Sequence, residues 1–404
     1  PSRGLGDVYK RQPIISYVSA KNKNKKRNIK IKKIQWLNNY LDATKHKDID
    51  LIVELIGGSE GPAKKLVFEA LKNKKHVVTA NKALIAKYGN QLSKIAEKNN
   101  VNLEFEAAVC GGVPIIRLLK EGLIANKISK VYGILNGTSN YILSAMDKQN
   151  KSFDVVLKNA KNLGYAESNP FSDLNGGDVA AKLKILSSLC FNSFLNNKIY
   201  VEGIKDIDKK DIDNSNKLGY KIKLLGYAEI LNNIIYQRVH PTLVKKSSYI
   251  GSIDGVLNAV IIDGKPMGQS IIQGEGAGSS ATTSALVSDI SSILRGNIKF
   301  PFSLSNDERK TLKFHNINER FFSAYIRFEV LDKPGVLSNI TNAFSKNKVS
   351  IKRLVQDPNH NKKSSSIVII THKSKDKFLN KIIKEITKKN YIKRKPKLIR
   401  IDDN

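Results

Sequence analysis

Apolar and polar residues are distributed in three different ways along the chain, and each pattern predicts its own kind of structure. In the first part, short apolar runs are separated by segments with apolar residues at helical spacing. The predicted strands are residues 14–20, 50–56, 76–79 and 101–105, and the predicted helices are residues 61–73 and a segment that begins near Lys82. Such alternation with short connections is typical of a parallel, doubly wound α/β sheet. We assign residues 13–130 to this domain.

Longer helices and scattered strands follow over residues 131–302, and they predict an α+β domain. The predicted helices are 139–148, 153–163 and 177–192, and the strand-like segments are 198–202, 234–239 and 258–262. The glycine-rich stretch at 273–283 (QGEGAGSSATT) opens another helix that ends at about Leu294. We expect this helix, at about 279–295, to return to the first domain and complete its nucleotide-binding fold.

The last region, residues 321–404, has a legible strand–helix–strand–strand–helix–strand order. The predicted strands are 325–331, 350–356, 365–371 and 391–401, and the helices lie within 334–347 and at 376–389. This βαββαβ order predicts a ferredoxin-like unit. The polar stretch at 303–320 is the predicted linker to it.

The chain has 404 residues and a formal net charge of +33, which would suit a nucleic-acid-binding protein. The excess is mostly lysine and is dispersed, without zinc-ligand spacing or an RNA-binding signature, so we expect no nucleic-acid partner. No apolar run approaches the roughly 20 residues that span a bilayer, so we expect no membrane segment. We see no signal peptide, and Cys110 and Cys190 are far apart in sequence. Both observations favour a reducing, cytoplasmic location.

The first residues of the chain are excluded from the fold prediction. Residues 2–12 (SRGLGDVYKRQ) match the in-frame translation of a transposase-based sequencing adaptor, so residues 1–12 are interpreted as non-native. Gly4 and Gly6 have the spacing of a phosphate-binding loop, but they follow no strand. We therefore expect the first strand of the doubly wound sheet and its glycine loop to be missing. Whether such a chain retains activity stays open.

Four motifs follow one another along the chain: VVTANKAL at 77–84, EAAVCGGVPII at 106–116, GILNGTSNYIL at 133–143 and GYAESNPFSDLNGGDVAAKLKIL at 164–186. In sequence and order they resemble homoserine dehydrogenases, and LDKPGVLSNI at 331–340 resembles an ACT domain. The resemblance implies a Rossmann-like nucleotide-binding domain, a substrate and dimerisation domain, and a C-terminal regulatory domain. It also implies NAD(P)-dependent interconversion of L-aspartate 4-semialdehyde and L-homoserine, a step in threonine, methionine and isoleucine biosynthesis.

The fourth motif carries most of the residues expected to act on the substrate. Asp178 and Lys182 are four residues apart, so they share one helix face, and apolar residues continue that face toward the core. For such a pair taken alone, a surface ion pair is the alternative. The resemblance implies that Glu167 and Asp178 bind the substrate ammonium group and that Asp173 orients Lys182 or the substrate. Lys182 is the expected proton donor and acceptor, because a partly desolvated ammonium group can give up its proton.

Cofactor-binding residues are expected at strand ends and before helices. Gly57 and Gly58 end a predicted strand, where the lack of side chains lets the backbone approach a cofactor, although an ordinary turn is the alternative. Thr79, Asn81 and Lys82 follow another strand, at the edge where open α/β sheets bind ligands. The family uses this lysine near the nicotinamide and the reacting carbonyl, so Lys82 is also a catalytic candidate; a helix-capping asparagine beside a solvated lysine is the alternative. Three more glycines complete the expected set: Gly164, Gly276 and Gly278.

Two finer predictions concern the cofactor and an ion. Lys21 and Lys23 stand after the strand at 14–20, where an acidic residue would bind the NAD ribose, so we predict NADP over NAD. A second set of residues resembles the family's monovalent-cation site, and one carboxylate with backbone carbonyls suits Na⁺ or K⁺. That set is Glu106, Val109, Gly111 and Val113. Packing of a turn is the alternative, and no histidine spacing suggests zinc.

The C-terminal unit is expected to bind an effector. Residues 332–335 (DKPG) form a predicted tight turn into a helix, and such turns in ACT domains often bound an amino-acid site at a dimer interface. L-threonine is the natural candidate, in a homodimer or homotetramer, and a purely oligomerising module is the alternative. The rival interpretation of the whole chain is a catalytically inactive, amino-acid-binding regulatory protein. That rival predicts disrupted catalytic positions, whereas all of these positions carry the residues that the family pattern requires.

Overall fold

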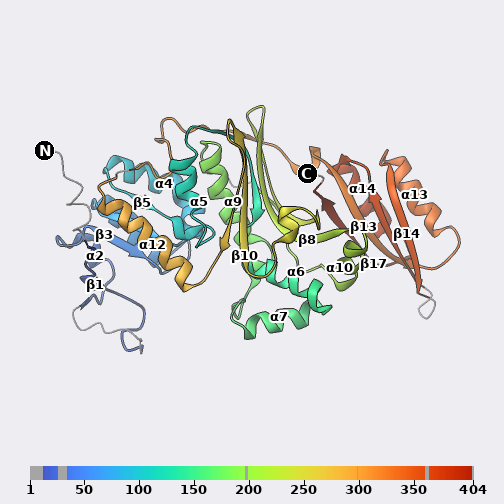
Figure 1. Cartoon of the computed structure of the whole chain (residues 1–404), viewed down its shortest axis with the longest axis horizontal. Helices are drawn as coiled ribbons and strands as arrows, with labels where there is room; N and C mark the ends of the chain where they lie inside the picture. Colours follow the sequence, from blue (N-terminus) through green and yellow to red (C-terminus); the bar gives the residue numbers. More distant parts are fainter. Residues whose placement is uncertain (1–11, 26–33, 196–198, 298, 360–363, 403–404) are drawn as a thin grey trace. The chain divides into compact units, whose positions relative to one another are not determined.

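The computed structural model describes residues 12–25, 34–195, 199–297, 299–359 and 364–402. The chain divides into two compact units (Figure 1). Unit 1 contains Pro1–Val131, Ala181–Asn197 and Val260–Leu312, and unit 2 contains Tyr132–Ala180, Lys198–Ala259 and Lys313–Asn404. Three elements run along the chain from one unit into the other: α9 (Gly177–Cys190), β6 (Lys127–Ile134) and β10 (Leu257–Lys265). Each unit is therefore assembled from segments that are distant in sequence.

A parallel three-stranded sheet organises unit 1. Its strands, in spatial order, are β3 (Leu51–Glu54), β4 (His76–Thr79) and β5 (Leu103–Glu104). Helices α3 (Pro62–Lys72) and α4 (Lys82–Lys98) connect them. A proline in the first turn suits the start of α3, and its buried residues recur at the spacing of one helix face. The predicted alternation of strands and helices in a parallel sheet is confirmed.

A helix from much later in the sequence also belongs to unit 1. α12 (Ser279–Leu294) packs against β4 and against the 3-10 turn η1 (Glu106–Ala108). The carboxylate of Asp289 on α12 accepts a hydrogen bond from the backbone nitrogen of Glu106 at 2.9 Å. The helix predicted at about 279–295 is confirmed, and β11 (Gly268–Glu275) occupies the first part of the glycine-rich stretch before it. Strands β11, β10 and β6 are neighbours in that order.

The strand predicted at 14–20 is much shorter than expected. β1 is Tyr17–Val18, and it forms a separate two-stranded parallel sheet with β2 (Gln35–Trp36) instead of joining β3, β4 and β5. Ile14 and Ile15 are 86% and 69% exposed, so no core covers the start of this apolar run, and a run without a surface to pack on does not become a strand. The predicted adaptor segment lies, except for Gln12, outside the described residues.

A long sheet organises unit 2, in the order β6-β8-β9-β17-β13-β15-β14. The pair β8 (Tyr220–Leu231) and β9 (Ile234–Lys245) is antiparallel, and β9 pairs in parallel with β17 (Ile392–Ile401). The short β7 (Tyr200–Val201) also pairs with β9. The helices that lie wholly in this unit before the C-terminal domain are α6 (Gly137–Gln149), α7 (Phe153–Asn162), α8 (Phe171–Leu174), α10 (Lys209–Lys217) and α11 (Tyr249–Ser252).

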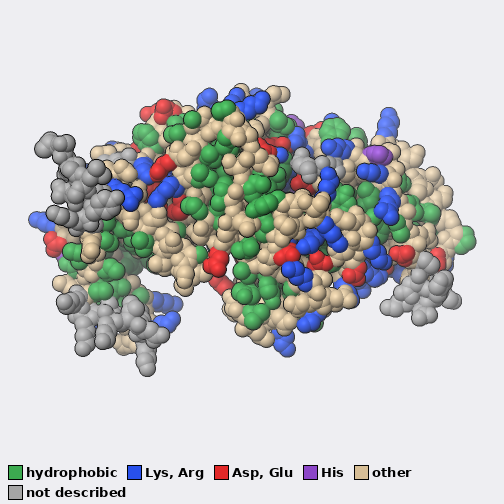
Figure 2. Space-filling view, viewed as in Figure 1, with side chains coloured by type: hydrophobic (Ala, Val, Ile, Leu, Met, Phe, Trp, Pro, Cys, Tyr) green, Lys and Arg blue, Asp and Glu red, His purple; other side chains and the backbone are tan. Residues whose placement is uncertain are grey.

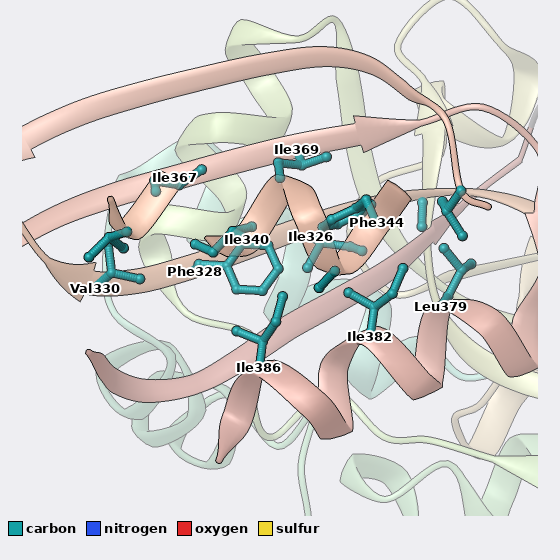
Figure 3. Packing of buried hydrophobic residues seen from close by; sticks show 14 of the residues in the cluster. Ile326, Phe328, Val330, Ile340, Phe344, Ile367, Ile369, Leu379, Ile382 and Ile386 are labelled. Atoms are coloured by element: carbon teal, nitrogen blue, oxygen red, sulfur yellow. The ribbon is translucent and has the colours of Figure 1, made fainter. Parts of the chain in front are cut away.

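The C-terminal part of unit 2 has the predicted ferredoxin-like order. Its elements are β13 (Phe321–Leu331), α13 (Val336–Lys346), β14 (Ile351–Asn359), β15 (Ser364–Thr371), α14 (Asp376–Thr387) and β17. Figure 3 shows the core, in which Ile340 and Phe344 of α13 and Ile382 of α14 pack with Phe328 of β13 and Ile367 of β15. Apolar residues on one face of each helix and of the sheet explain this two-layer packing.

The predicted linker at 303–320 is more ordered than its polar composition suggests. The chain passes from unit 1 to unit 2 within it, after Leu312. However, Arg309 is buried, and its guanidinium group donates to Ser188 Oγ at 3.0 Å and to the Ser193 carbonyl at 2.9 Å. Burial lowers the pKa of Arg309 to about 10. Polar side chains such as this one can be buried once their hydrogen bonds are satisfied.

Candidate active site

The carboxyl ends of β3 and β4 in unit 1 are joined by a buried carboxylate. Glu54 is fully buried, and its Oε1 accepts hydrogen bonds from the backbone nitrogens of Ile56 at 2.7 Å and Gly57 at 2.9 Å. Its Oε2 accepts a hydrogen bond from the hydroxyl of Thr79 at 2.6 Å. Glu54 therefore fixes the turn after β3 and connects it to the end of β4, at the edge where open parallel sheets bind ligands.

Asn81 extends this network to the N-terminus of α4. Its Oδ1 accepts a hydrogen bond from the backbone nitrogen of Leu84 at 3.1 Å, which caps the helix, and its Nδ2 donates to the carbonyl of Gly58 at 2.8 Å. Its own backbone nitrogen donates to Thr79 Oγ1 at 2.9 Å. These hydrogen bonds bring together four residues that were predicted to bind the cofactor, namely Gly57, Gly58, Thr79 and Asn81. Lys82, the first residue of α4, is half-buried beside them in sequence.

Three features of this edge would suit a nucleotide. Gly57 and Gly58 are exposed and have φ of 82° and 81°, a backbone region that favours glycine. A Cβ on Gly57 would meet no atom within 4 Å, so the backbone lies open to a ligand. The backbone nitrogens at the start of α4 provide the partial positive charge that suits a phosphate group.

Two loops predicted as separate sites lie against each other in unit 1. The backbone nitrogen of Gly112 donates to the carbonyl of Glu275 at 2.9 Å. A Cβ on Gly111 would lie 3.1 Å from the carbonyl oxygen of Gly276, so glycine allows this close approach. The glycine loop before α12, with Gly276 and Gly278, therefore contacts the loop that carries Gly111 and Val113.

The carboxylate of Glu106 has a structural task. It accepts hydrogen bonds from the backbone nitrogens of Ile116 at 2.9 Å and Arg117 at 2.7 Å, at the start of the short helix α5 (Ile115–Arg117). Each of its oxygens accepts one hydrogen bond, and a carboxylate oxygen has two lone pairs, so the monovalent-cation site at Glu106, Val109, Gly111 and Val113 stays a prediction.

Other buried charges surround Glu106. Lys120 donates to Glu104 Oε2 at 2.8 Å, and both side chains are buried. Burial, together with the negative charges of Glu104 and Glu106, raises the pKa of Asp289 to about 7. Burial also raises the pKa of Glu106. The region holds several carboxylates in the core of unit 1, and the charge of one of them, Asp289, is sensitive to pH near neutrality.

A second cluster lies in unit 2, at the start of α6. The side chain of Asn136 donates from Nδ2 to Asp173 Oδ1 at 2.8 Å and to Asp178 Oδ2 at 2.9 Å. Its Oδ1 accepts a hydrogen bond from the backbone nitrogen of Ser139 at 2.7 Å and so caps α6. Asn136 and Asp178 are buried, and Asp173 is half-buried. Two carboxylates that were predicted to act on the substrate are therefore held by one amide group.

The remaining predicted residues lie on α9 and on the segment between α7 and α8. Lys182 is 7% exposed and Asp178 is 5% exposed, so the expectation that this helix face points inward is confirmed. Glu167 is exposed on the segment between α7 and α8. Gly164, with φ of 75°, ends α7 and has open space where a Cβ would be. Thr138, at the start of α6, donates to the carbonyl of Tyr165 at 2.7 Å and so holds this segment.

Two important residues were missed by the sequence analysis. Glu54 is the last residue of a strand whose sequence was interpreted as a continuous apolar run, so its carboxylate was not considered as a functional group. Asn136 lies within one of the four motifs, and its position after a strand and before a helix is the signal of a capping residue. Neither signal reveals the distant partners of these side chains.

The surface charges and the hydropathy of the helices concern two other classes of partner, nucleic acid and membrane. On the face in Figure 2, lysine and arginine side chains occur over both units with aspartate and glutamate side chains among them. The expectation of no nucleic-acid partner stays a prediction. Among the helices of the described residues, none is both long enough and apolar enough to cross a bilayer.

Comparison with known proteins follows the same division of the chain. Residues 114–291 match the family model "Homoserine dehydrogenase", residues 10–106 match "Homoserine dehydrogenase, NAD binding domain", and residues 324–389 match "ACT domain". The homoserine dehydrogenase of Neisseria gonorrhoeae is 40% identical over 365 residues, which cover 88% of this chain and 83% of that protein.

Solved structures agree with these matches. The crystal structure of a homoserine dehydrogenase from Thiobacillus denitrificans has a TM-score of 0.86 and 39% identity, covering 92% of this chain and 86% of the other. A hyperthermophilic archaeal homoserine dehydrogenase in complex with NADPH has a TM-score of 0.56 and 27% identity, covering 63% and 74% of the two chains. With its NAD-binding, catalytic and ACT domains, the chain belongs to the homoserine dehydrogenase family.

Proposed function

We propose that this oxidoreductase interconverts L-homoserine and L-aspartate 4-semialdehyde with Lys182 as the group that moves the proton. In the oxidative direction, the C4–H bond of homoserine breaks with its electron pair, and the hydroxyl proton passes to the amine of Lys182 as the aldehyde forms. In the reverse direction, the ammonium group of Lys182 returns that proton to the new alkoxide. This role suits a lysine that is 7% exposed, because exclusion of water favours transfer to the substrate over exchange with solvent.

The substrate's own ammonium group is assigned to the carboxylates. We propose that Glu167 and Asp178 bind it and that Asp173 orients the substrate or Lys182. The single observation that supports this assignment best is the hydrogen-bonded group of Asn136, Asp173 and Asp178, because it gathers negative charge immediately before Lys182 on α9. Two carboxylates brought together favour a cationic ligand.

The cofactor assignment follows from the edge of the parallel sheet. A nicotinamide dinucleotide, when bound, supplies or accepts the hydride. Gly57, Gly58, Thr79 and Asn81 would hold it, since the exposed glycine backbone and the capped start of α4 suit a phosphate and a ribose. Lys82 would lie toward the reacting carbonyl, and Gly164, Gly276 and Gly278 would allow close backbone approach. The residues present therefore fit the group.

Within NAD(P), we propose a preference for NADP. Lys21 and Lys23 follow β1 and are exposed, so they are available to a 2′-phosphate, and no acidic residue stands with them. The related archaeal homoserine dehydrogenase was solved in complex with NADPH, which supports this preference. A monovalent cation, Na⁺ or K⁺, would be held by Glu106, Val109, Gly111 and Val113, through one carboxylate and backbone carbonyls.

The C-terminal domain is assigned to regulation and assembly. We propose that L-threonine binds near the turn at 332–335, which is exposed and enters α13 through Gly335 with φ of 82°. We also propose a homodimer or homotetramer and a cytoplasmic location, with the buried thiols of Cys110 and Cys190 suited to a reducing compartment. Light scattering with and without threonine tests the assembly and the effector together.

The assigned reaction is tested by homoserine-dependent reduction of NADP⁺ at alkaline pH, with Lys182→Ala beside the unchanged protein. Activity in the unchanged protein and a loss of at least about a hundredfold in the variant are expected, the usual size of a proton-transfer contribution. Lys158→Ala, on the surface of α7, is the matched control. If the folded protein binds NADP but oxidises no homoserine, the proposed substrate is wrong. If Lys182→Ala is as active as the control, the proposed role of Lys182 is wrong.

A further inference from the structure

We propose that Asn136 is a positioning residue of the reaction, which sets the spacing and orientation of Asp173 and Asp178 through one amide nitrogen. The inference rests on the proposed function, since it concerns the carboxylates that are assigned to the substrate. The two acceptors come from different elements, because Asp173 lies on α8 and Asp178 lies in the first turn of α9. They are 37 and 42 residues from Asn136 in sequence.

The bridge uses the full donor capacity of the amide. An asparagine NH₂ group has two N–H bonds, and Asn136 directs one to Asp173 Oδ1 at 2.8 Å and the other to Asp178 Oδ2 at 2.9 Å. Hydrogen bonds to ionised carboxylates are stronger and more directional than neutral ones. The amide itself is neutral, so it draws the two carboxylates together without adding a positive charge between them.

The other end of the side chain is also fixed. Asn136 Oδ1 accepts a hydrogen bond from the backbone nitrogen of Ser139 at 2.7 Å, and Ser139 Oγ donates a hydrogen bond to the carbonyl of Asn136 at 3.2 Å. The next residue is tightly placed, because a Cβ on Gly137 would lie 2.5 Å from the carbonyl oxygen of Val256. The amide therefore cannot follow the carboxylates if they move, and the carboxylates must adapt to the amide.

The turn that joins the two carboxylates is fixed independently. The backbone nitrogen of Ile204 donates to the carbonyl of Leu174 at 2.8 Å, just after Asp173. A Cβ on Gly203 would lie 2.1 Å from that same carbonyl oxygen. With the backbone of α8 held by Gly203 and the side chains held by Asn136, the carboxylates are arranged before a substrate arrives. Such preorganisation favours binding and catalysis because little ordering is needed on binding.

Three substitutions separate positioning from helix capping. Asn136→Ser keeps an oxygen that can cap α6 but removes the NH₂ group. Asn136→Asp also keeps the cap and places a third carboxylate beside the pair. Asn136→Ala removes both functions. Asn316→Ser is the matched control, since exposed Asn316 caps the short helix η3 (Ile317–Glu319) with the same side-chain oxygen.

We expect Asn136→Ser to keep the Tm of the unchanged protein and to raise the KM for homoserine by about tenfold, with the KM for NADP unchanged. In Asn136→Asp the acid limb of the kcat/KM profile should move to higher pH, because the added carboxylate raises the pKa of its neighbours. Asn136→Ala should show the same KM effect and a lower Tm. The control Asn316→Ser should leave KM and the pH profile unchanged.

The result that overturns the inference is a normal KM and a normal pH profile in a folded Asn136→Ser, with only Asn136→Ala impaired, since capping alone would then explain the residue. Asp178→Asn, measured in parallel, separates this failure from that of the proposed function. If Asp178→Asn is impaired and Asn136→Ser is normal, only the positioning role is wrong. If Asp178→Asn is also normal, the assignment of the carboxylates to the substrate is wrong and the positioning role falls with it.

Discussion

Asn81 and Asn136 use the same local device in two different units. Each follows a strand, and each caps the next helix with its Oδ1, which accepts a hydrogen bond from the backbone nitrogen three residues later. The donors are Leu84 for Asn81 and Ser139 for Asn136. Each also donates from Nδ2 to another segment. The acceptors differ, because Asn81 donates to the backbone carbonyl of Gly58, whereas Asn136 donates to the side chains of two aspartates.

The difference in acceptors matches the ligand that each region is proposed to bind. In unit 1 the asparagine fixes the backbone of the turn after β3, and a dinucleotide is recognised largely through backbone groups and helix N-termini. In unit 2 the asparagine fixes negative side chains, and an ammonium group is recognised through charge. A capping asparagine can therefore organise either kind of site, and its second acceptor indicates which.

The largest expected effect is that of Glu54→Ala, which removes the carboxylate that holds the turn after β3. Asn81 contacts the same turn through the carbonyl of Gly58. Two backbone nitrogens and the hydroxyl of Thr79 would lose their acceptor, so we expect the free energy of unfolding to fall by about 3 kcal/mol. Denaturant unfolding measures this loss. Glu60→Ala, an exposed glutamate in the same segment, should change stability little. Equal stability of the two variants would show that the Glu54 network does not support unit 1.

A somewhat smaller effect is expected from Asp289→Asn, and it should depend on pH. Because burial and the charges of Glu104 and Glu106 raise the pKa of Asp289 to about 7, ionisation of this group costs stability in the folded protein. Its contribution is fully present below about pH 4, the ordinary range of an aspartate, and is lost as the pH rises through about 7.

The asparagine variant does not ionise, so its free energy of unfolding relative to that of the unchanged protein should rise steadily between pH 4 and pH 8. Unfolding curves at a series of pH values measure the difference. Asp154→Asn, on the exposed start of α7, is the control and should show no such trend. A constant difference across this interval would mean that Asp289 ionises normally in unit 1.

The comparison itself is tested by Asn81→Ser, the counterpart of Asn136→Ser. Serine keeps the cap on α4 but cannot reach the carbonyl of Gly58, so the turn after β3 loses one restraint. We expect the KM for NADP to rise by about tenfold with the KM for homoserine unchanged. Asn81→Ser should therefore raise only the KM for NADP, whereas Asn136→Ser should raise only the KM for homoserine. If both raise the same KM, the two asparagines do not organise separate sites.

The smallest expected effect concerns Lys21 and Lys23, which lie outside both networks. Their double replacement by alanine should lower the ratio of kcat/KM for NADP to that for NAD by only a few fold, because exposed charge pairs contribute about 0–1 kcal/mol. Lys45 and Lys47, also early in the chain, serve as the control pair. An unchanged ratio would remove these lysines from the 2′-phosphate site.

Much of this account could be predicted from the sequence where local pattern and packing agree. The apolar stripe of α3, the run of β4 and the βαββαβ order each carry their own signal. The pattern failed where tertiary context decides. β8 was missed because buried Lys223 and Glu229 interrupt its apolar character, and Lys223 is tolerated there because it donates to Asn140 Oδ1 at 3.1 Å.

The candidate site was predictable in its residue types but not in its connections. Asp178 and Lys182 could be placed on one inward face from their spacing together with the apolar residues that continue this face. The hydrogen bonds of the Glu106 carboxylate to Ile116 and Arg117 could not be predicted, because they depend on a turn ten residues later. The bridge from Asn136 to Asp173 and Asp178 likewise depends on how α6, α8 and α9 fold together, which no local pattern encodes.

The central claim is that Asp178, held in place by Asn136, recognises the ammonium group of the substrate. The most direct test compares homoserine with 4-hydroxybutanoate, which is homoserine without its amino group, in the unchanged protein and in Asp178→Asn. We predict that the unchanged protein prefers homoserine strongly and that this preference, the ratio of the two kcat/KM values, falls by at least about tenfold in the variant. A ratio that stays the same while both activities fall together would contradict the claim, because Asp178 would then act on something other than the amino group.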